Sequence, residues 1–451
     1  MRALPGRAVN IVGAGLAGAL LALLLARRGL TVNLYERRPD PRQAHPERGR
    51  SINLALAARG RRALEQAGLM QRVQPLLIAM RGRMVHERNG HASLQPYGQR
   101  EHEVIWSVGR AELNRVLIEE AARHGSVSVR FSQRCRGADL VSDRLQLRDA
   151  LTGEDYQAEL APTIATDGAG SAVRASLNAA GLVAAHDEWL DHDYKELTVS
   201  AALAAGKLER HALHIWPRGG FMLIALPNTD GSFTATLFLA RQGAQSFAAL
   251  ASADALHQFF RDEFADALPL LPDLAAQFAA NPQGQLGTVH ATPWHVGGQV
   301  LLLGDAAHAI VPFHGQGMNA AFEDCSVLDA LIPEHADWHS LFAAFEQQRR
   351  PNAAAIAQMA LENYIEMRDA VLDARFVRRK NIAMGLERRF PDRFIPRYSM
   401  VMFHPEIPYA EALRRGALQA QLLEELDPGS DAAPDARRAE QLINERLPPL
   451  P

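Results

Sequence analysis

Hydrophobic and polar positions change their spacing several times along this chain, and the changes predict its elements. Residues 9–12 are a short apolar run typical of a buried strand, and residues 16–28 form an apolar stretch of helical length that stops at Gly29. Residues 31–35 return as a second strand. This order of strand, glycine-rich turn, helix and strand is a βαβ unit, so the N-terminal region is predicted to begin a parallel sheet.

The next part of the chain alternates between loop, helix and strand. Residues 39–50 are rich in Pro, Arg and His without any apolar period, and we expect a loop there. Residues 113–122 repeat a helical period behind Arg110, and residues 127–131 have the pattern of another strand. The pattern therefore favours an α/β domain in this half of the chain.

From about residue 195 to 240 the sequence pattern changes to short strand-like runs separated by Pro and Gly turns, which predicts an antiparallel sheet. The runs are 197–199, 213–216, 221–224 and 233–238. Helical patterns dominate from 318 to about 425, and we expect interruptions at Pro351 and between Pro391 and Pro408. From Pro428 onward the chain is polar with Pro and Ala, and we predict a loose tail.

The composition is that of an ordinary globular protein, and it excludes some classes of binding partner. The chain has 451 residues, of which 47% are hydrophobic and 22% charged, enough for two packed domains and a buried ligand. Its net charge of −3 argues against nucleic acid. Cys135 and Cys325 cannot make a disulfide framework, which favours a reducing compartment. No apolar stretch approaches the roughly 20 residues that span a bilayer, so we expect a soluble, cytoplasmic protein.

The turn of the βαβ unit has the GxGxxG spacing of a dinucleotide site. Gly13 permits the tight turn, Gly15 lets the backbone approach a pyrophosphate, and Gly18 lets the helix pack closely on the sheet. The helix start adds unpaired N–H groups and the positive end of a dipole. Glu36, at the end of the second strand, can accept hydrogen bonds from ribose hydroxyls.

Two later motifs extend this nucleotide site. Asp167 ends a strand and precedes Gly168. An Asx-Gly pair also occurs commonly in ordinary turns that bind no ligand. Asp305 follows the buried strand at 300–304 and stands where α/β sheets place ligands, so it can reach a second ribose. Arg110 opens a helix, where an arginine is otherwise an ordinary surface residue.

The loop at 312–319, Pro-Phe-His-Gly-Gln-Gly-Met-Asn, leads into another helix start. Its glycines permit close approach to a planar ring, and free N–H groups there suit the N1–C2=O edge of a reduced flavin, where negative charge develops. A plain helix N-cap loop is the competing interpretation. Together with the two earlier motifs, in this order, the loop indicates an FAD enzyme.

Two clusters that suggest other chemistry are interpreted as structural. The acidic residues at 187–188 and 191–193 resemble a metal site, but no HExxH motif or Cys pair supports it, so we expect a solvated acidic loop and no metal. His308 and His314 invite an acid–base role, yet no nucleophile context accompanies them.

The three motifs in this order are similar to those of the single-component flavin-dependent aromatic hydroxylases, which reduce FAD with NAD(P)H and then use O2. Within that family the chain resembles the bacterial branch that hydroxylates L-kynurenine. The resembling segments extend over most of residues 9–415 and are 49–56, 81–84, 193–197, 304–324, 362–367 and 396–403. Animal and fungal members of this branch carry a hydrophobic C-terminal membrane segment, whereas residues 416–451 contain no apolar run of that length.

The resemblance implies an α/β fold in which a Rossmann-like FAD-binding domain is interleaved with an antiparallel-sheet substrate domain and followed by a helical C-terminal region. We expect a first FAD-binding part at 1–190 with a substrate-contacting insert around 50–105, the sheet domain at 191–285, a second FAD-binding part at 286–335, and the helical region with its polar tail at 336–451.

The implied activity is the NADPH- and O2-dependent hydroxylation of L-kynurenine to 3-hydroxy-L-kynurenine through a C4a-hydroperoxyflavin, in tryptophan degradation and the synthesis of quinolinate and NAD. FAD would be bound and NADPH would be a transient co-substrate. Because the flavin carries the chemistry, no protein acid or base is assigned. We expect a monomer or homodimer.

The resemblance also implies a set of site residues. Four would hold the amino-acid carboxylate of the substrate: Arg83, Tyr97, Asn363 and Tyr398. Five would line the pocket around the aromatic ring: Pro312, Phe313, His314, Glu366 and Met367. Together with the motif positions, the FAD contacts would be Gly13, Gly15, Gly18, Glu36, Arg37, Ala55, Arg110, Asp167, Asp305, Gly317, Met318 and Asn319. A guanidinium fork flanked by phenols is a good carboxylate receptor.

Two alternatives stay open. A sister hydroxylase of a phenolic acid such as salicylate would share the FAD motifs but would have no use for Arg83, Tyr97 and Tyr398. A flavin sensor or electron-transfer module would leave the region from 195 to 410 without a purpose. The sequence contains no second GxGxxG unit that would place NADPH.

Overall fold

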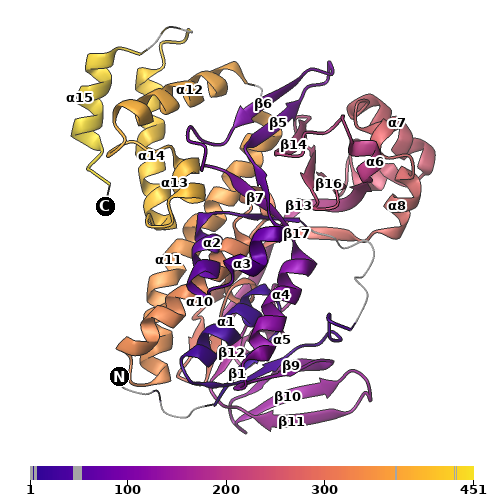
Figure 1. Ribbon diagram of the computed structural model, residues 1–451, viewed down its shortest axis with the longest axis vertical. Coiled ribbons are helices and arrows are strands. Elements are labelled where there is room, and N and C mark those ends of the chain that lie inside the picture. Colours follow the sequence, from indigo (N-terminus) through magenta and orange to yellow (C-terminus); the bar gives the residue numbers. More distant parts are fainter. Residues whose placement is uncertain are drawn as a thin grey trace. The chain divides into compact units, whose positions relative to one another are not determined.

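Segments that are distant in the sequence assemble into two units in the computed structural model (Figure 1). The first unit comprises Met1–Leu77, Val108–Leu190 and Gln285–Ala353, and the second comprises Ile78–Ser107, Asp191–Gly284 and Ala354–Pro451. The structure describes Leu4 and residues 8–43, 53–370, 373–430, 432 and 434–450. The predicted loop at 39–50 and the resembling segment at 49–56 lie partly outside the described residues.

The predicted βαβ unit is confirmed in the first unit. β1 (Ala8–Val12) leads through the glycine turn into α1 (Leu16–Arg27), and β2 (Thr31–Tyr35) pairs with β1 in parallel. The leucines of α1 lie in the core, because Leu20, Leu21 and Leu25 are fully buried. Burying these apolar side chains holds the helix on the sheet.

The sheet of the first unit has the strand order β18-β19-β12-β1-β2-β8. Its further strands are β8 (Val127–Arg130), β12 (Thr163–Ala165), β18 (His295–Val296) and β19 (Val300–Leu302). Since β1, β12 and β19 are parallel, their carboxyl ends lie at one edge. The three motifs that follow these strands therefore meet at that edge, where open α/β sheets bind ligands.

Helices cover this sheet, and a small antiparallel sheet stands beside it. α4 (Arg110–Arg123) and α10 (Gly317–Leu331) pack on α1, and α2 (Ala58–Gln66) packs on α10. The small sheet contains β9 (Gln133–Asp139), β10 (Arg144–Asp149) and β11 (Asp155–Glu159), with α5 (Ala172–Ala179) against β9. Short elements complete the unit: β3 (Asn53–Leu56), α3 (Met70–Val73) and α9 (Asp305–His308). The helix and strand predicted at 113–122 and 127–131 are confirmed.

The predicted antiparallel sheet is confirmed as part of a seven-stranded sheet with the order β17-β13-β16-β15-β14-β5-β6, in which β17 is Gln283–Thr292. The strands are β5 (Gly82–His86), β6 (Ala92–Pro96), β13 (Ala184–Val199), β14 (Ala212–Pro217), β15 (Met222–Pro227) and β16 (Phe233–Ala240). β5 comes from an earlier stretch of the chain and pairs with β14 in parallel. Trp216, Phe233, Phe260 and Leu274 belong to one apolar cluster that joins the sheet to α7 (Ala253–Glu263) and α8 (Leu274–Ala280).

The predicted interruption at Pro351 is wrong, because α11 (Trp338–Ile365) runs through it as one helix. A proline inside a helix costs about 3 kcal/mol. Fully buried side chains on both flanks, including Phe345 and Ile356, provide packing that outweighs this cost. A π-helical turn, Glu366–Ala370, follows directly.

The predicted break between Pro391 and Pro408 is confirmed, since α12 (Ala374–Arg389) ends before it and α14 (Tyr409–Leu426) begins after it. A short helix, α13 (Arg397–Phe403), lies inside this stretch. It carries Tyr398, one of the predicted substrate residues.

The prediction of a loose tail is wrong, because α15 (Ala436–Arg446) forms after Pro428. The Asp435 side chain caps its first N–H groups. Ala439, Leu442 and Ile443 follow a helical spacing and are buried in a cluster with α12 and α14. The polar composition of the tail concealed this apolar stripe, which tertiary packing uses.

The prediction of a solvated acidic loop at 187–193 is also wrong, since these residues belong to the long strand β13. Within the described ranges, no group of three or more His, Cys, Asp or Glu side chains is placed to hold a metal ion. In the described part of the chain, no helix combines the length and the apolar character that crossing a membrane requires.

Candidate functional site

Two glycines of the N-terminal motif are required because neighbouring backbone atoms leave no room for a side chain. Gly13 has a φ of +97°, and a Cβ atom there would lie 2.7 Å from the carbonyl oxygen of Thr166. A Cβ atom on Gly18 would lie 1.9 Å from the carbonyl oxygen of Gly13. Both contacts are too short, so these positions tolerate only glycine: one for the turn and the other for close helix packing.

Gly15 is different, because no atom of the chain lies within 4 Å of the position its Cβ would occupy. It is the N-cap residue of α1, with an extended backbone that any residue can adopt. The first turn of α1 has no acidic residue. Open space beside unpaired helix N–H groups is the environment that a phosphate group requires.

Glu36 holds the glycine turn in place. Its Oε2 atom accepts a hydrogen bond from the N–H of Ala14 at 2.8 Å, and its Oε1 atom accepts one from the N–H of Arg38 at 2.9 Å. A carboxylate has about four acceptor positions, so capacity for ribose hydroxyls remains. Arg37, beside it, is exposed. The ribose role of Glu36 stays a prediction.

Asp167 has one occupied and one unoccupied carboxylate oxygen. Its Oδ2 atom accepts a hydrogen bond from the N–H of Ala172 at the start of α5, at 2.8 Å. Its Oδ1 atom is buried and has no hydrogen-bond partner within the described part of the chain. Burial raises the pKa of this carboxyl group. A buried polar atom without a partner is costly, so this oxygen suits a hydrogen-bond donor on a ligand.

Gly304 and Asp305 form the turn that follows β19. Gly304 has a φ of +61°, and a Cβ atom there would lie 3.1 Å from the Cβ of Ala321 on α10. The Asp305 carboxylate is exposed and has no partner among the described residues. The Arg174 side chain, which follows the Asp167 turn, donates to the carbonyl oxygen of Ala306 at 2.9 Å. The second and third motifs are therefore tied together.

A buried ion cluster lies behind this turn. The Asp324 carboxylate is fully buried and contacts three donors: the Nε of Arg349 at 2.6 Å, the Nε2 of His308 at 2.7 Å and the N–H of Gly304 at 3.1 Å. Burial alone would raise the pKa of Asp324, but the His308 and Arg349 charges hold it below its usual value. The prediction that His308 is structural agrees with this pairing.

Asp324 and Arg349 were not identified as functional candidates from the sequence. One signal was available, because Asp324 falls on the apolar stripe of α10 that contains Ala321 and Leu328. An acidic residue on the buried face of a helix requires a partner.

The loop at 312–319 is organised by the side chain of Asn319. Its Oδ1 atom accepts a hydrogen bond from the N–H of Ala57 at 2.9 Å, and its Nδ2 atom donates to the carbonyl oxygens of Ala55 and Gly315, both at 2.8 Å. The amide is thus occupied within the protein. If Asn319 contacts a flavin, as predicted, the contact would use its backbone near the start of α10. Gly317 and Met318 begin that helix.

These features together fit FAD. The open space at Gly15, the orphan oxygen of Asp167 and the free carboxylate of Asp305 lie along the carboxyl edge of one sheet. Arg110 is exposed at the start of α4. Its role at the cofactor stays a prediction.

In the second unit, Arg83 of β5 lies beside a pair of tyrosine rings. Its guanidinium carbon lies 4.9 Å from the ring centre of Tyr398 and 5.9 Å from that of Tyr97. The two rings are stacked, with centroids 5.8 Å apart. Burial raises the pKa of both phenols, so they stay protonated and able to donate. Arg83 is 6% exposed, and its Nε atom has no partner within the described residues.

This arrangement has the groups that a carboxylate receptor requires. Two aromatic rings hold the guanidinium fork in one orientation, and protonated phenols beside it can donate to the same anion. The structure thus brings together Arg83, Tyr97 and Tyr398, which are far apart in the sequence. Glu366 joins them, since its Oε1 atom accepts a hydrogen bond from Arg83 Nη1 at 3.4 Å.

The remaining predicted substrate residues divide between the two units. Asn363 is buried near the end of α11 and donates to the Sδ atom of Met367 at 3.2 Å. Phe313 and His314 are buried in the first unit, and Pro312 is exposed there. Their contacts with a substrate stay predictions.

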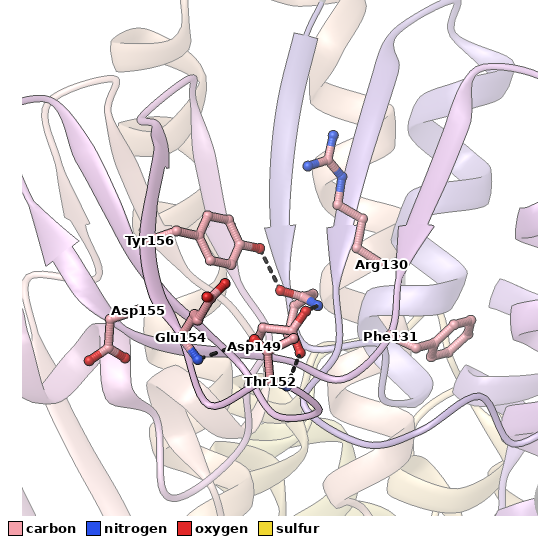
Figure 2. Close-up of a pocket in the computed structure, with 8 residues that line it drawn as sticks. Arg130, Phe131, Asp149, Thr152, Glu154, Asp155 and Tyr156 are labelled. Carbon is pink, nitrogen blue, oxygen red and sulfur yellow. Dashed lines mark hydrogen bonds between the residues drawn. The ribbon is translucent and has the colours of Figure 1, made fainter.

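A separate hollow of about 750 Å³ opens on the first unit (Figure 2). The Tyr156 hydroxyl donates to Gln133 Oε1 at 2.7 Å, and Gln133 Nε2 donates to Asp149 Oδ2 at 2.9 Å. Three polar side chains of the hollow therefore bond to one another. The lining residues are Arg130, Phe131, Gln133, Asp149, Thr152, Glu154, Asp155 and Tyr156, and no predicted site residue is among them.

Comparison with known proteins agrees with this geometry. Residues 7–360 match the family model described as "FAD binding domain". The chain is similar to the kynurenine 3-monooxygenase of Stenotrophomonas maltophilia (strain K279a), with 48% identity over 447 residues that cover 98% of each chain. It is also similar to the kynurenine 3-monooxygenase of Myxococcus xanthus (strain DK1622), with 48% identity over 445 residues, or 98% of this chain and 96% of the relative.

Solved structures of lower identity share the fold. The tetrameric form of 2-methyl-3-hydroxypyridine-5-carboxylic acid oxygenase superposes with a TM-score of 0.66 at 22% identity, covering 81% of this chain and 94% of that one. PqsL of P. aeruginosa, in complex with 2-aminobenzoylacetate, superposes with a TM-score of 0.64 at 21% identity, covering 81% and 97%. This likeness confirms the predicted fold class, a mixed α/β FAD-binding fold with a helical C-terminal region.

Proposed function

The chain belongs to the kynurenine 3-monooxygenase family of FAD-binding proteins, and from this premise we propose that it catalyses the NADPH- and O2-dependent hydroxylation of L-kynurenine to 3-hydroxy-L-kynurenine. The observation that carries the proposal is the cluster of Arg83 with Tyr97 and Tyr398, found in a chain that matches these relatives over 98% of its length. A hydroxylase of simple phenols would have no need of a buried guanidinium held in this way.

The first unit would bind FAD, which when bound supplies the redox chemistry by taking electrons from NADPH and delivering one oxygen atom of O2 to the substrate. The N–H groups at the start of α1, beside Gly15, would hold the pyrophosphate. Asp167 Oδ1 and the Asp305 carboxylate would accept hydrogen bonds from cofactor hydroxyls. Backbone N–H groups near Gly317 would stabilise negative charge that develops on the ring.

The second unit would bind and orient L-kynurenine. Arg83 would hold the α-carboxylate, with the Tyr97 and Tyr398 hydroxyls as further donors and Asn363 assisting. A bidentate guanidinium fixes direction as well as affinity, so the aromatic ring of the substrate would project in one defined direction. Buried side chains such as Met367 would exclude water from the ring. No residue of the chain is assigned a proton transfer.

The proposal is tested by following NADPH oxidation by the purified FAD-loaded protein with and without L-kynurenine, while the product is identified by mass. We expect kynurenine to stimulate oxidation and to gain one oxygen atom. Stimulation without hydroxylated product would make kynurenine an effector only, and salicylate and related phenolic acids would be tested next. No response to any of these acids would favour a flavin protein without oxygenase activity.

The Arg83→Ala variant distinguishes substrate binding from FAD binding. It should retain FAD, because Arg83 lies in the second unit and the cofactor residues lie in the first. It should lose most of its affinity for L-kynurenine. Unchanged affinity in this variant would contradict the carboxylate assignment.

A further inference from the structure

Two opposite charges meet at the carboxylate receptor of the second unit. The Nη1 atom of Arg83 lies 3.4 Å from the Oε1 atom of Glu366, and the side chains are 8% and 28% exposed. Glu366 is the first residue of the π-helical turn that follows α11. Such turns occur frequently at functional sites, because they displace side chains from the regular helical path.

The contact between these two residues is loose. By comparison, Arg28 and Asp329 of the first unit form a bidentate pair with two hydrogen bonds of 2.8 Å. The one hydrogen bond between Arg83 and Glu366 is long, and the other side-chain hydrogen bonds of Arg83 are with Tyr97 and Tyr398. The Nε atom of Arg83 has no partner among the described residues. A purely structural ion pair at this depth would be expected to use the whole fork. Both groups therefore keep capacity for a ligand.

A third charge belongs to the same cluster. Lys380 of α12 is close enough to Arg83 and Glu366 for both to act on its ammonium group. Burial, together with the positive charge of Arg83, lowers the pKa of Lys380 to about 8, while Glu366 opposes the shift. The receptor thus contains two cationic groups and one carboxylate. A ligand carboxylate on Arg83 would be attracted by both cationic groups but would stand beside Glu366, and a positive group on the same ligand would offset that local repulsion.

We propose that Glu366 receives the α-ammonium group of the ligand while Arg83 receives its α-carboxylate, so that the receptor selects α-amino acids over plain carboxylic acids. An α-amino acid carries both groups on one carbon atom, and the adjacent Arg83 and Glu366 offer the complementary pair. Glu366 would then act at the amino-acid end of the substrate rather than around its aromatic ring. The inference rests on the proposed function, since it takes the ligand to be L-kynurenine.

The test compares two ligands on the FAD-loaded protein, with dissociation constants measured by titration calorimetry. The ligands are L-kynurenine and 4-(2-aminophenyl)-4-oxobutanoate, which keeps the ring and carboxylate but lacks the α-ammonium group. A hydrogen bond between charged groups corresponds to about 10- to 100-fold in affinity, so we expect the wild-type protein to prefer L-kynurenine by about this factor. In Glu366→Gln the preference should fall towards one, because kynurenine binds more weakly and the analogue does not.

The matched control is Glu362→Gln, one helical turn earlier on α11, where the carboxylate pairs with Arg397. This variant should keep the wild-type preference. The inference is overturned if Glu366→Gln keeps that preference, or if both ligands weaken equally, which would show that Glu366 only positions Arg83. Hydroxylation of L-kynurenine by the wild-type protein in the same preparation separates these results from a failure of the proposed function. If the wild-type protein neither binds nor hydroxylates L-kynurenine, the proposed function and the inference both fail.

Discussion

The Nε2 atom of His308 lies 2.7 Å from the Oδ2 atom of Asp324, and the same carboxylate oxygen accepts the N–H of Gly304 at 3.1 Å. One buried acid therefore fixes both ends of the short segment that presents Asp305. The cluster lies behind the predicted cofactor site, and we expect it to act on a bound cofactor only through the backbone that it holds. We therefore predict that its members are positioning residues.

Asp324→Asn should therefore weaken both the fold and FAD binding. The substitution removes one charge from a buried, hydrogen-bonded cluster. Arg349 loses one of its two carboxylate partners and keeps Glu323, so the expected cost is about 1–3 kcal/mol. Thermal unfolding with FAD removed should report the loss of stability, and titration with FAD should report weaker binding. The exposed Asp337→Asn, elsewhere in the first unit, is the control. A stable variant with unchanged FAD affinity would show that the cluster does not position the turn.

Gly15→Ala should weaken FAD binding without changing the stability of the FAD-free protein. Because the added Cβ meets no atom of the chain, the stability of the FAD-free protein should change by less than about 0.5 kcal/mol. The methyl group would nevertheless occupy the space assigned to the pyrophosphate, so the affinity for FAD should fall at least about tenfold. Gly125→Ala, also in open space, should change neither quantity. Unchanged FAD affinity in Gly15→Ala would contradict the phosphate assignment.

Arg83→Lys should show that the fork, and not only the charge, binds the substrate. Lysine keeps the positive charge but loses the bidentate geometry and the contacts of the guanidinium with the Tyr97 and Tyr398 rings. We expect the dissociation constant for L-kynurenine to rise about 10- to 100-fold, with the flavin absorbance unchanged. The neighbouring exposed Arg81→Lys is the control. Wild-type affinity in Arg83→Lys would reduce the role of Arg83 to that of a point charge.

Stability should fall as the solution becomes acidic, in part because of His214. This imidazole lies 2.8 Å from His86 Nε2 and 3.0 Å from the carbonyl oxygen of Glu209, and burial lowers its pKa from 6.5 to about 4. Between these values the unfolded chain binds a proton that the folded chain does not, so the free energy of unfolding decreases as pH falls from 6.5 to about 4. The full effect is on the order of 3 kcal/mol.

Urea unfolding at pH 7 and pH 5 measures this dependence. The loss of stability between the two pH values should be smaller in His214→Gln than in the wild-type protein, because glutamine does not titrate. Gln258→Ala, at an exposed position of α7, removes no titratable group and should leave the dependence unchanged. An equal loss in wild type and His214→Gln would assign the acid sensitivity to other groups.

Leu442→Ala should destabilise the second unit, although the residue lies in a stretch of polar composition. Leu442 is fully buried in the cluster that joins α15 to α12 and α14. Replacing a buried leucine with alanine costs about 2–5 kcal/mol through lost burial and the cavity that remains. Thermal unfolding should detect this loss, whereas the exposed Glu440→Ala should change stability by less than about 0.5 kcal/mol. Equal stabilities would mean that α15 contributes nothing to the core.

Local features of this protein could be predicted from the sequence by itself. The βαβ unit and its glycine turn follow from residues that are neighbours in the chain, since Gly13, Gly15 and Gly18 act within a few residues of one another. The antiparallel sheet of the second unit follows from period-two patterns for the same reason. The family resemblance added the substrate residues, which neither periodicity nor spacing would have indicated.

Only the tertiary structure decided the contacts between distant segments. Arg83 meets Glu366 across 283 positions of sequence, and no local pattern encodes that distance. Contacts between distant segments also decide which residues pair with Asp324, why α11 continues through Pro351 and why α15 is buried. In each case, packing between elements outweighs a local preference of a few kcal/mol, and the sequence pattern reports the preference but not the packing.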